Sequence, residues 1–122
     1  MKIRIKGDSI RLRLSKTEVD NFSKNGFLEE RTSFCDNQFV YRMESRSDFS
    51  ELSAALDGQT MTVYVPETQA KEWTSTDLVG FENNMNTGEG KTLFLLVEKD
   101  FVCLDNTLED QSDNYPNPNA MC

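Results

Sequence analysis

The residues in this chain whose types and spacing could do chemistry are basic side chains near the N-terminus. They recur at every second position of two short segments, as Lys2, Arg4 and Lys6 and then as Arg11 and Arg13. Guanidinium and ammonium groups bind phosphate and carboxylate oxygens, and arginine can do so through two parallel hydrogen bonds. We therefore predict an anion-binding or partner-binding site at these residues.

The positive charge of this basic cluster could be neutralised or used in several ways. Its charge could be neutralised within the chain, by carboxylates such as Glu98 and Asp100 or by the acidic residues that follow position 104. The arginines could instead converge on a small phosphorylated or carboxylated ligand, or contact an acidic protein surface. Nucleic acid is disfavoured as the main partner, because the whole chain carries a net charge of -8 and duplex binding usually needs a basic surface.

Other chemical signals in the sequence are weaker. Histidine is absent, which removes Ser-His-Asp and Cys-His nucleophile pairs and the commonest general base. The string from Gly88 to Thr92 ends like a phosphate-binding P-loop, but that motif needs a glycine where this chain has Met85 and a helix where an apolar run follows. We expect a glycine turn before a strand there. No cofactor is predicted, and the sequence leaves open whether the chain is an enzyme.

The C-terminal acids and the cysteines allow further alternatives. The acids could supply oxygen ligands to calcium or magnesium, but their spacing does not match an EF-hand, so a solvated tail is the preferred interpretation. The odd number of cysteines, without a Cys-x-x-Cys pair, predicts reduced thiols, although Cys103 and Cys122 could approach each other if the tail folds back. The residues concerned are Asp105, Glu109, Asp110 and Asp113, and Cys35, Cys103 and Cys122.

A β-hairpin must position the basic residues. The segments 2–6 and 9–14 alternate apolar and charged residues, which is typical of half-buried strands, and Gly7-Asp8 between them favours a two-residue turn. Like charges then face one another across the strands, which is unfavourable, so a negative counter-charge is expected to cover them. The predicted pairs are Ile5 with Ile10 and Ile3 with Leu12 on one face, and Arg4 with Arg11 and Lys2 with Arg13 on the other.

The remaining elements are predicted from their end signals. Ser15 and Glu18 form a capping box that starts a helix, and Asn25-Gly26 ends it. Pro66 favours a second short helix over Glu67–Trp73. Two more hairpins are expected from turn residues, and two strands from apolar runs. The hairpins are Phe27–Phe34 with Gln38–Arg46, pairing Phe34 with Phe39, and Glu51–Leu56 with Gln59–Val65; the strands are Val79–Asn83 and Thr92–Val97.

These elements predict an α+β fold, with a mostly antiparallel sheet or small barrel of seven or eight strands and two short helices. We expect residues 1–104 to form one globular domain and residues 105–122 an acidic tail rich in proline and asparagine, with no internal repeat. The chain begins without a secretory signal, and its longest apolar run, Leu93–Val97, is too short to cross a bilayer. A cytoplasmic location without membrane attachment is therefore expected.

Several segments spread over nearly the whole chain carry a family resemblance: 1–7, 9–14, 18–19, 79–83, 93–101 and 109–115. In these segments the chain resembles a small bacterial family, often met in Bacteroidetes, that has no assigned activity. The resemblance implies a bacterial cytoplasmic setting, and it transfers no catalytic or binding residue.

The leading functional hypothesis is a non-catalytic binding or interaction module that uses the basic N-terminal strands. The alternative is an enzyme or receptor for a phosphorylated or carboxylated small molecule, with a metal ion held by carboxylates. The alternative requires Arg4, Arg11 and Arg13 to point into a pocket that also holds at least two acids. A binding module would instead present them on an open face or already paired.

Overall fold

The computed structural model describes residues 1–101. It has eight strands and two helices, which confirms the predicted α+β class; the predicted tail lies outside the described residues. In chain order the elements are β1 (Lys2–Ile5), β2 (Ser9–Leu14), α1 (Lys16–Asn25), β3 (Phe27–Ser33), β4 (Gln38–Arg46), β5 (Ser53–Asp57), β6 (Thr60–Pro66), α2 (Glu67–Ser75), β7 (Gly80–Gly88) and β8 (Lys91–Lys99).

The strands form two separate four-stranded sheets, not the single sheet or barrel that was predicted. Sheet A has the order β1-β2-β8-β7 and sheet B the order β3-β4-β6-β5. Each sheet consists of two antiparallel hairpins joined by a central parallel pair, β2 with β8 and β4 with β6. The prediction missed this arrangement because turn residues report only hairpins, whereas parallel strands are joined through distant connections.

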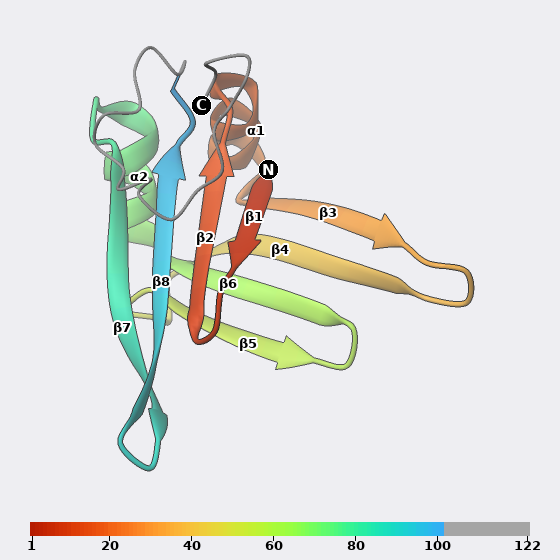
Figure 1. The fold of residues 1–122 in the computed structure, drawn as a ribbon. Helices are drawn as coiled ribbons and strands as arrows, with labels where there is room; N and C mark the ends of the chain where they lie inside the picture. Colours follow the sequence, from red (N-terminus) through yellow and green to blue (C-terminus); the bar gives the residue numbers. More distant parts are fainter. Residues whose placement is uncertain (102–122) are drawn as a thin grey trace, which may run out of the picture.

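The two sheets lie face to face with their strands running across one another, and the two helices stand side by side at one end (Figure 1). The core lies between the inner faces of the sheets and the helices. It includes Leu12, Leu14, Met43, Val63 and Val97, all fully or almost fully buried. No helix in the described part of the chain is long and apolar enough to cross a membrane.

The first hairpin matches its prediction residue by residue, with Arg4 opposite Arg11 and Ile5 opposite Ile10. The turn of the β5–β6 hairpin lies one residue later than predicted, at Gly58-Gln59, so Asp57 pairs with Thr60 and Leu56 with Met61. The β3–β4 register is shifted by two residues, because the turn is a four-residue loop in which the Phe34 N–H donates to the Asn37 carbonyl (2.6 Å). Thr32 consequently pairs with Phe39. A shift of two residues leaves every side chain on its predicted face.

The helix ends agree with the end signals. The Ser15 hydroxyl accepts from the Glu18 N–H (3.3 Å), the Glu18 carboxylate accepts from the Ser15 N–H (2.8 Å), and Gly26 closes α1 in the left-handed conformation. Helix α2 begins at Glu67, as predicted, and ends two residues later than expected, at Ser75, with Pro66 as its N-cap at the end of β6. Val19 and Phe22 of α1 and Ala70 and Trp73 of α2 are buried.

The structure also contains a repeat that the sequence does not reveal. Residues 2–46 and 53–99 each form a hairpin, a helix and a second hairpin. Strands β1 to β4 of the first half correspond in order to β5 to β8 of the second. If each strand is replaced by its counterpart, the order of sheet A becomes that of sheet B. Equivalent positions share burial and backbone shape but mostly differ in residue type, which is why no sequence repeat is visible. The equivalent pairs include the core residues Leu12 and Val63, the helix residues Phe22 and Trp73, and the turn glycines Gly7 and Gly58, with φ of 54° and 58°.

Candidate functional site

The predicted cations form one surface on the outer side of sheet A, which we call the basic face: Lys2, Arg4, Lys6, Arg11 and Arg13. Lys2 and Arg4 extend from β1 and Arg11 and Arg13 from β2, directly opposite one another across the hairpin. Lys6 continues the alternation just beyond β1. The hairpin therefore brings together all the residues that the sequence singled out, because period-two alternation sends them to the same side of the sheet.

The last strand supplies carboxylates to this surface, as the sequence analysis allowed. The parallel pairing of β2 with β8 places Glu98 beside Arg13. The Glu98 carboxylate accepts from Arg13 Nε at 2.7 Å and lies 3.7 Å from Arg11 Nε. Asp100 pairs with the Lys2 ammonium at 2.8 Å. Part of the positive charge is thus balanced within the chain.

The balance is incomplete within the described residues. Arg4 and Lys6 are exposed and form no ion pair with any residue in 1–101. The side chain of Arg11 is 30% exposed and that of Lys2 is 74% exposed, so both of these paired cations remain accessible to solvent. An incoming carboxylate or phosphate group can therefore reach the basic face without first entering a pocket.

Apolar residues border the basic face on the same side of sheet A. Phe94 and Leu96 of β8 are only half-buried, and they lie opposite Ser9 and Arg11 in the parallel ladder. Sequence analysis missed this border, although the alternation of Phe94, Leu96 and Glu98 along β8 was a usable signal. The outer side of sheet A therefore offers positive charge next to apolar surface.

The outer side of sheet B is the equivalent surface in the internal repeat, and it is balanced. Arg42 lies opposite Glu29 and also binds Glu44, while Arg46 binds Glu44 and Asp48 at 3.0 and 2.7 Å. Hydrogen bonds from Arg46 lower the pKa of Glu44 and of Asp48. Aromatic rings pack beneath these arginines, which adds cation–π attraction. The rings are Phe27 under Arg42, and Phe49 and Tyr64 under Arg46.

The contrast between the two outer faces identifies the basic face as the candidate site. Both are built on the same topology, so neither the fold nor the pleat requires an unbalanced surface. On sheet B, three arginines meet three carboxylates along β3 and β4 and just beyond the end of β4. On sheet A, the five basic residues meet Glu98 and Asp100 within the described part of the chain. Among residues 1–101, the excess positive charge is thus specific to the outer side of sheet A.

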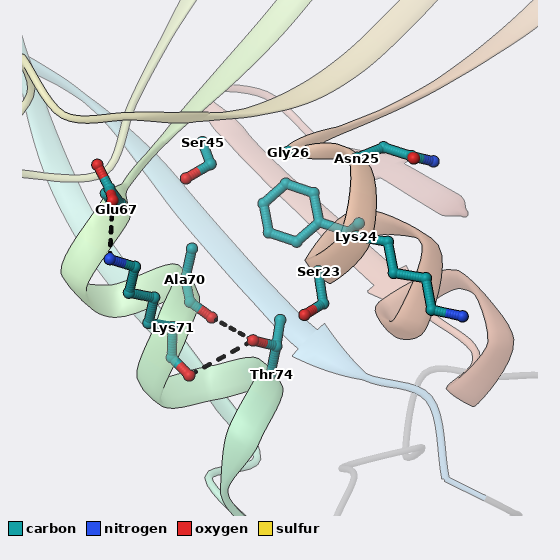
Figure 2. A pocket seen from close by; sticks show the side chains of 10 residues that line it. Ser23, Lys24, Asn25, Gly26, Ser45, Glu67, Ala70, Lys71 and Thr74 are labelled. Carbon is teal, nitrogen blue, oxygen red and sulfur yellow. Dashed lines mark hydrogen bonds and ion pairs between the residues drawn. The ribbon is translucent and has the colours of Figure 1, made fainter.

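A pocket of ≈ 370 Å³ lies between α1 and α2 (Figure 2). None of the residues of the basic face lines it. The Lys71 ammonium in its wall already pairs with Glu67 at 2.9 Å, and the Thr74 hydroxyl donates to the Ala70 carbonyl at 2.8 Å. Because no residue of the basic face reaches this pocket and two of its polar side chains already bond within α2, it is not our candidate site.

The other sequence signals have simpler outcomes. The P-loop-like string is the turn between β7 and β8, as predicted, with Gly88, Glu89 and Gly90 at positive φ. Among residues 1–101, no cluster of acids and cysteines could hold a metal ion, and Cys35 is a free, exposed thiol. The predicted acid cluster and Cys103 and Cys122 lie outside the described residues.

The pKa of Asp100 provides a direct test of the basic face. The hydrogen bond from Lys2 lowers the pKa of this carboxyl, and burial opposes it with a smaller effect. The contact therefore stabilises the fold at pH values above the ordinary aspartate pKa. This stabilisation is lost as the pH falls through the lowered pKa. We predict that Lys2→Met raises the pKa of Asp100 towards its ordinary value in a carbon-detected NMR titration. Lys6→Met, which removes an equal charge without a direct contact, should shift it much less; equal shifts would contradict the pairing.

Comparison with known proteins gives a family but no activity. The model of a family of unknown function, DUF7009, matches residues 1–119. The chain belongs to this family. The DUF7009 match covers both halves of the internal repeat and the entire basic face. No curated protein and no solved structure matches the chain significantly.

Proposed function

We propose that this DUF7009 member is a non-catalytic binding module whose contact surface is the basic face and whose partner is an acidic protein surface. The observation that carries the proposal is the contrast between two topologically equivalent outer faces, one balanced and one with an excess of positive charge. An open strand surface suits a protein partner, since protein interfaces are broad and combine charge with apolar area. The half-buried Phe94 and Leu96 beside the arginines supply such area.

The alternative of an enzyme or receptor for a small anion has less support. It requires the guanidinium groups to converge in a pocket with at least two acids. Arg11 and Arg13 instead contact Glu98 on the side of the sheet that faces away from the core. The proposal retains the bacterial and cytoplasmic setting implied by the family resemblance, and the free thiol of Cys35 is compatible with a reducing compartment.

A charge-reversal experiment tests the proposal. With fluorescent poly-L-glutamate as the probe, we expect Arg4→Glu/Lys6→Glu to weaken binding about tenfold, because removal of two exposed cations and addition of two anions acts on the encounter and on the bound state. The affinity of the unaltered chain should also fall as sodium chloride is raised. Fluorescence anisotropy measures both effects.

The matched control is Arg31→Glu/Lys24→Glu, which changes the net charge equally at exposed positions outside sheet A. This control should retain binding within about twofold if the contact is local. Equal loss in both double variants would mean that net charge alone governs binding and would refute the basic face as the site. Saturable binding of inorganic phosphate, with a rise in melting temperature and no affinity for poly-L-glutamate, would support the small-anion receptor instead.

A further inference from the structure

Strand β1 has an unusual combination of features for the edge of a sheet. It is the terminal strand of sheet A, so one of its sides has no neighbouring strand among residues 1–101. Its cations project from the outer face, while Ile5, on the inner face, remains 56% exposed. Short length and charged side chains, both present in β1, discourage an edge strand from pairing with other chains. The positive charge of β1 would repel a basic strand but attract an acidic one, for which its basic, apolar and hydrogen-bonding surfaces are accessible together.

The hydrogen-bonding pattern shows which backbone groups are directed outward. The Lys6 N–H donates to the Ser9 carbonyl at 3.0 Å, which makes Lys6 and Ser9 a hydrogen-bonded pair of the antiparallel ladder. Such pairs alternate with non-bonded ones, so Arg4 and Lys2 also bond to β2. The N–H and C=O groups of Ile3 and Ile5 therefore point away from β2, towards the open edge.

We propose that an extended acidic segment of another protein adds to sheet A by pairing with β1. This inference rests on the proposed function and names the form of the partner. Main-chain bonds to Ile3 and Ile5 would provide affinity, and the alternating side chains would provide specificity. The segment would alternate acidic and apolar residues, with its acids on the side of Arg4 and Lys6 and its apolar residues against Ile5.

The other edge strands lack this combination. Strand β5 occupies the equivalent position in the internal repeat, and its Leu56, which corresponds to Ile5, is 69% exposed. On its outer side, however, β5 carries Ser53, Ala55 and Asp57, which offer no positive charge. The outer sides of β3 and β7 carry the Glu29–Arg31 ion pair and the acid Glu82, respectively. Only β1 among these edges matches an acidic strand, and β5 provides an internal control.

The test uses the full chain and a short fluorescent peptide in which glutamate and valine alternate. We expect this peptide to bind about tenfold more tightly than a peptide of the same composition with its glutamates grouped at one end, because only the alternating order presents acids on one side of a strand. N-methylation of alternate amides should remove most of the gain, since it abolishes main-chain donors while retaining the charge. Binding should also slow amide hydrogen exchange at Ile3 and Ile5.

A matched pair of variants locates the contact on the protein. Ile5→Pro removes an outward N–H that β2 does not use, and proline is tolerated in edge strands, so the hairpin should remain folded while peptide binding is lost. Leu56→Pro makes the equivalent change in β5 and should leave binding intact. Loss of binding only in Leu56→Pro would overturn the assignment to β1. The N-methylated peptide tests the same point on the unaltered protein.

The outcomes separate this inference from the function on which it rests. Equal binding of the alternating and grouped peptides, with binding of poly-L-glutamate retained, would refute strand addition and leave the basic face as the contact surface. Absence of binding to any acidic probe would refute the proposed function itself. If the peptide bound only to a variant truncated after Phe101, the acidic residues 105–113 of this chain would be the segment that pairs with β1. The proposal of a partner protein would then be wrong.

Discussion

Replacement of Trp73 by alanine is expected to lower the free energy of unfolding by about 3–5 kcal/mol, the usual cost of truncating a buried aromatic residue. The side chain is fully buried. Its ring meets Phe22 and Phe81 edge to face, with centroids 6.3 and 5.5 Å apart, and its indole N–H donates to the Val79 carbonyl at 3.0 Å. The substitution removes contacts from both helices and from β7 together. Urea denaturation followed by far-UV circular dichroism measures the change.

Circular dichroism is required because Trp73 is the single tryptophan of the chain, so its removal also removes the indole fluorescence. Phe22→Ala, at the equivalent position of the other half, should cost a similar amount and leaves the fluorescent probe in place. Lys71→Ala, on the exposed side of α2, should change stability by less than about 1 kcal/mol, since surface ion pairs contribute little. A change in Trp73→Ala no larger than that of Lys71→Ala would contradict the packing described here.

Gly80→Ala is the second substitution with a large expected effect, a loss of about 2–3 kcal/mol typical of overpacking. A Cβ atom at Gly80 would lie 2.4 Å from the Val97 carbonyl oxygen and 2.9 Å from the Glu98 Cβ. The first of these atoms belongs to the backbone of β8, so β7 and β8 would have to separate. The same movement would displace Glu98, the carboxylate that holds Arg11 and Arg13. Chemical denaturation measures the loss of stability.

Gly7→Ala is the matched comparison, because its Cβ atom would meet nothing within 4 Å but would sit at a φ of +54°. A left-handed alanine costs about 1–2 kcal/mol, which is expected to be the smaller penalty. A larger loss in Gly7→Ala than in Gly80→Ala would show that β7 and β8 yield easily, and that the steric argument is wrong.

The sequence was most informative where structure depends on neighbouring residues. Gly7-Asp8 determines the register of the first hairpin, and the reciprocal bonds of Ser15 and Glu18 determine the start of α1. The β3–β4 register failed because several loop lengths fit between Phe27 and Arg46, and the four-residue loop brings Glu29 opposite Arg42. That pairing is electrostatically better than the predicted one, in which Arg42 would have faced Arg31.

The candidate site was predictable in part for the same reason. Alternation placed Arg4 and Arg11 on one face, and partial neutralisation of the basic face by Glu98 and Asp100 was among the expected alternatives. The way in which Glu98 reaches Arg13 was not predictable, since it depends on a parallel pairing between residues at opposite ends of the chain. The contrast between the outer faces was likewise hidden, because the internal repeat preserves burial and backbone shape without preserving residue type.

The parallel pairs at the centres of both sheets have a consequence for synthesis of the protein. Each joins one half of the chain to the other, so the first half alone can complete neither sheet. In sheet A, β2 cannot form its parallel pair until β8 has been synthesised, which requires more than eighty further residues. The basic hairpin is therefore made before the strand that it pairs with in sheet A, and such long-range pairing places the protein among slow-folding topologies.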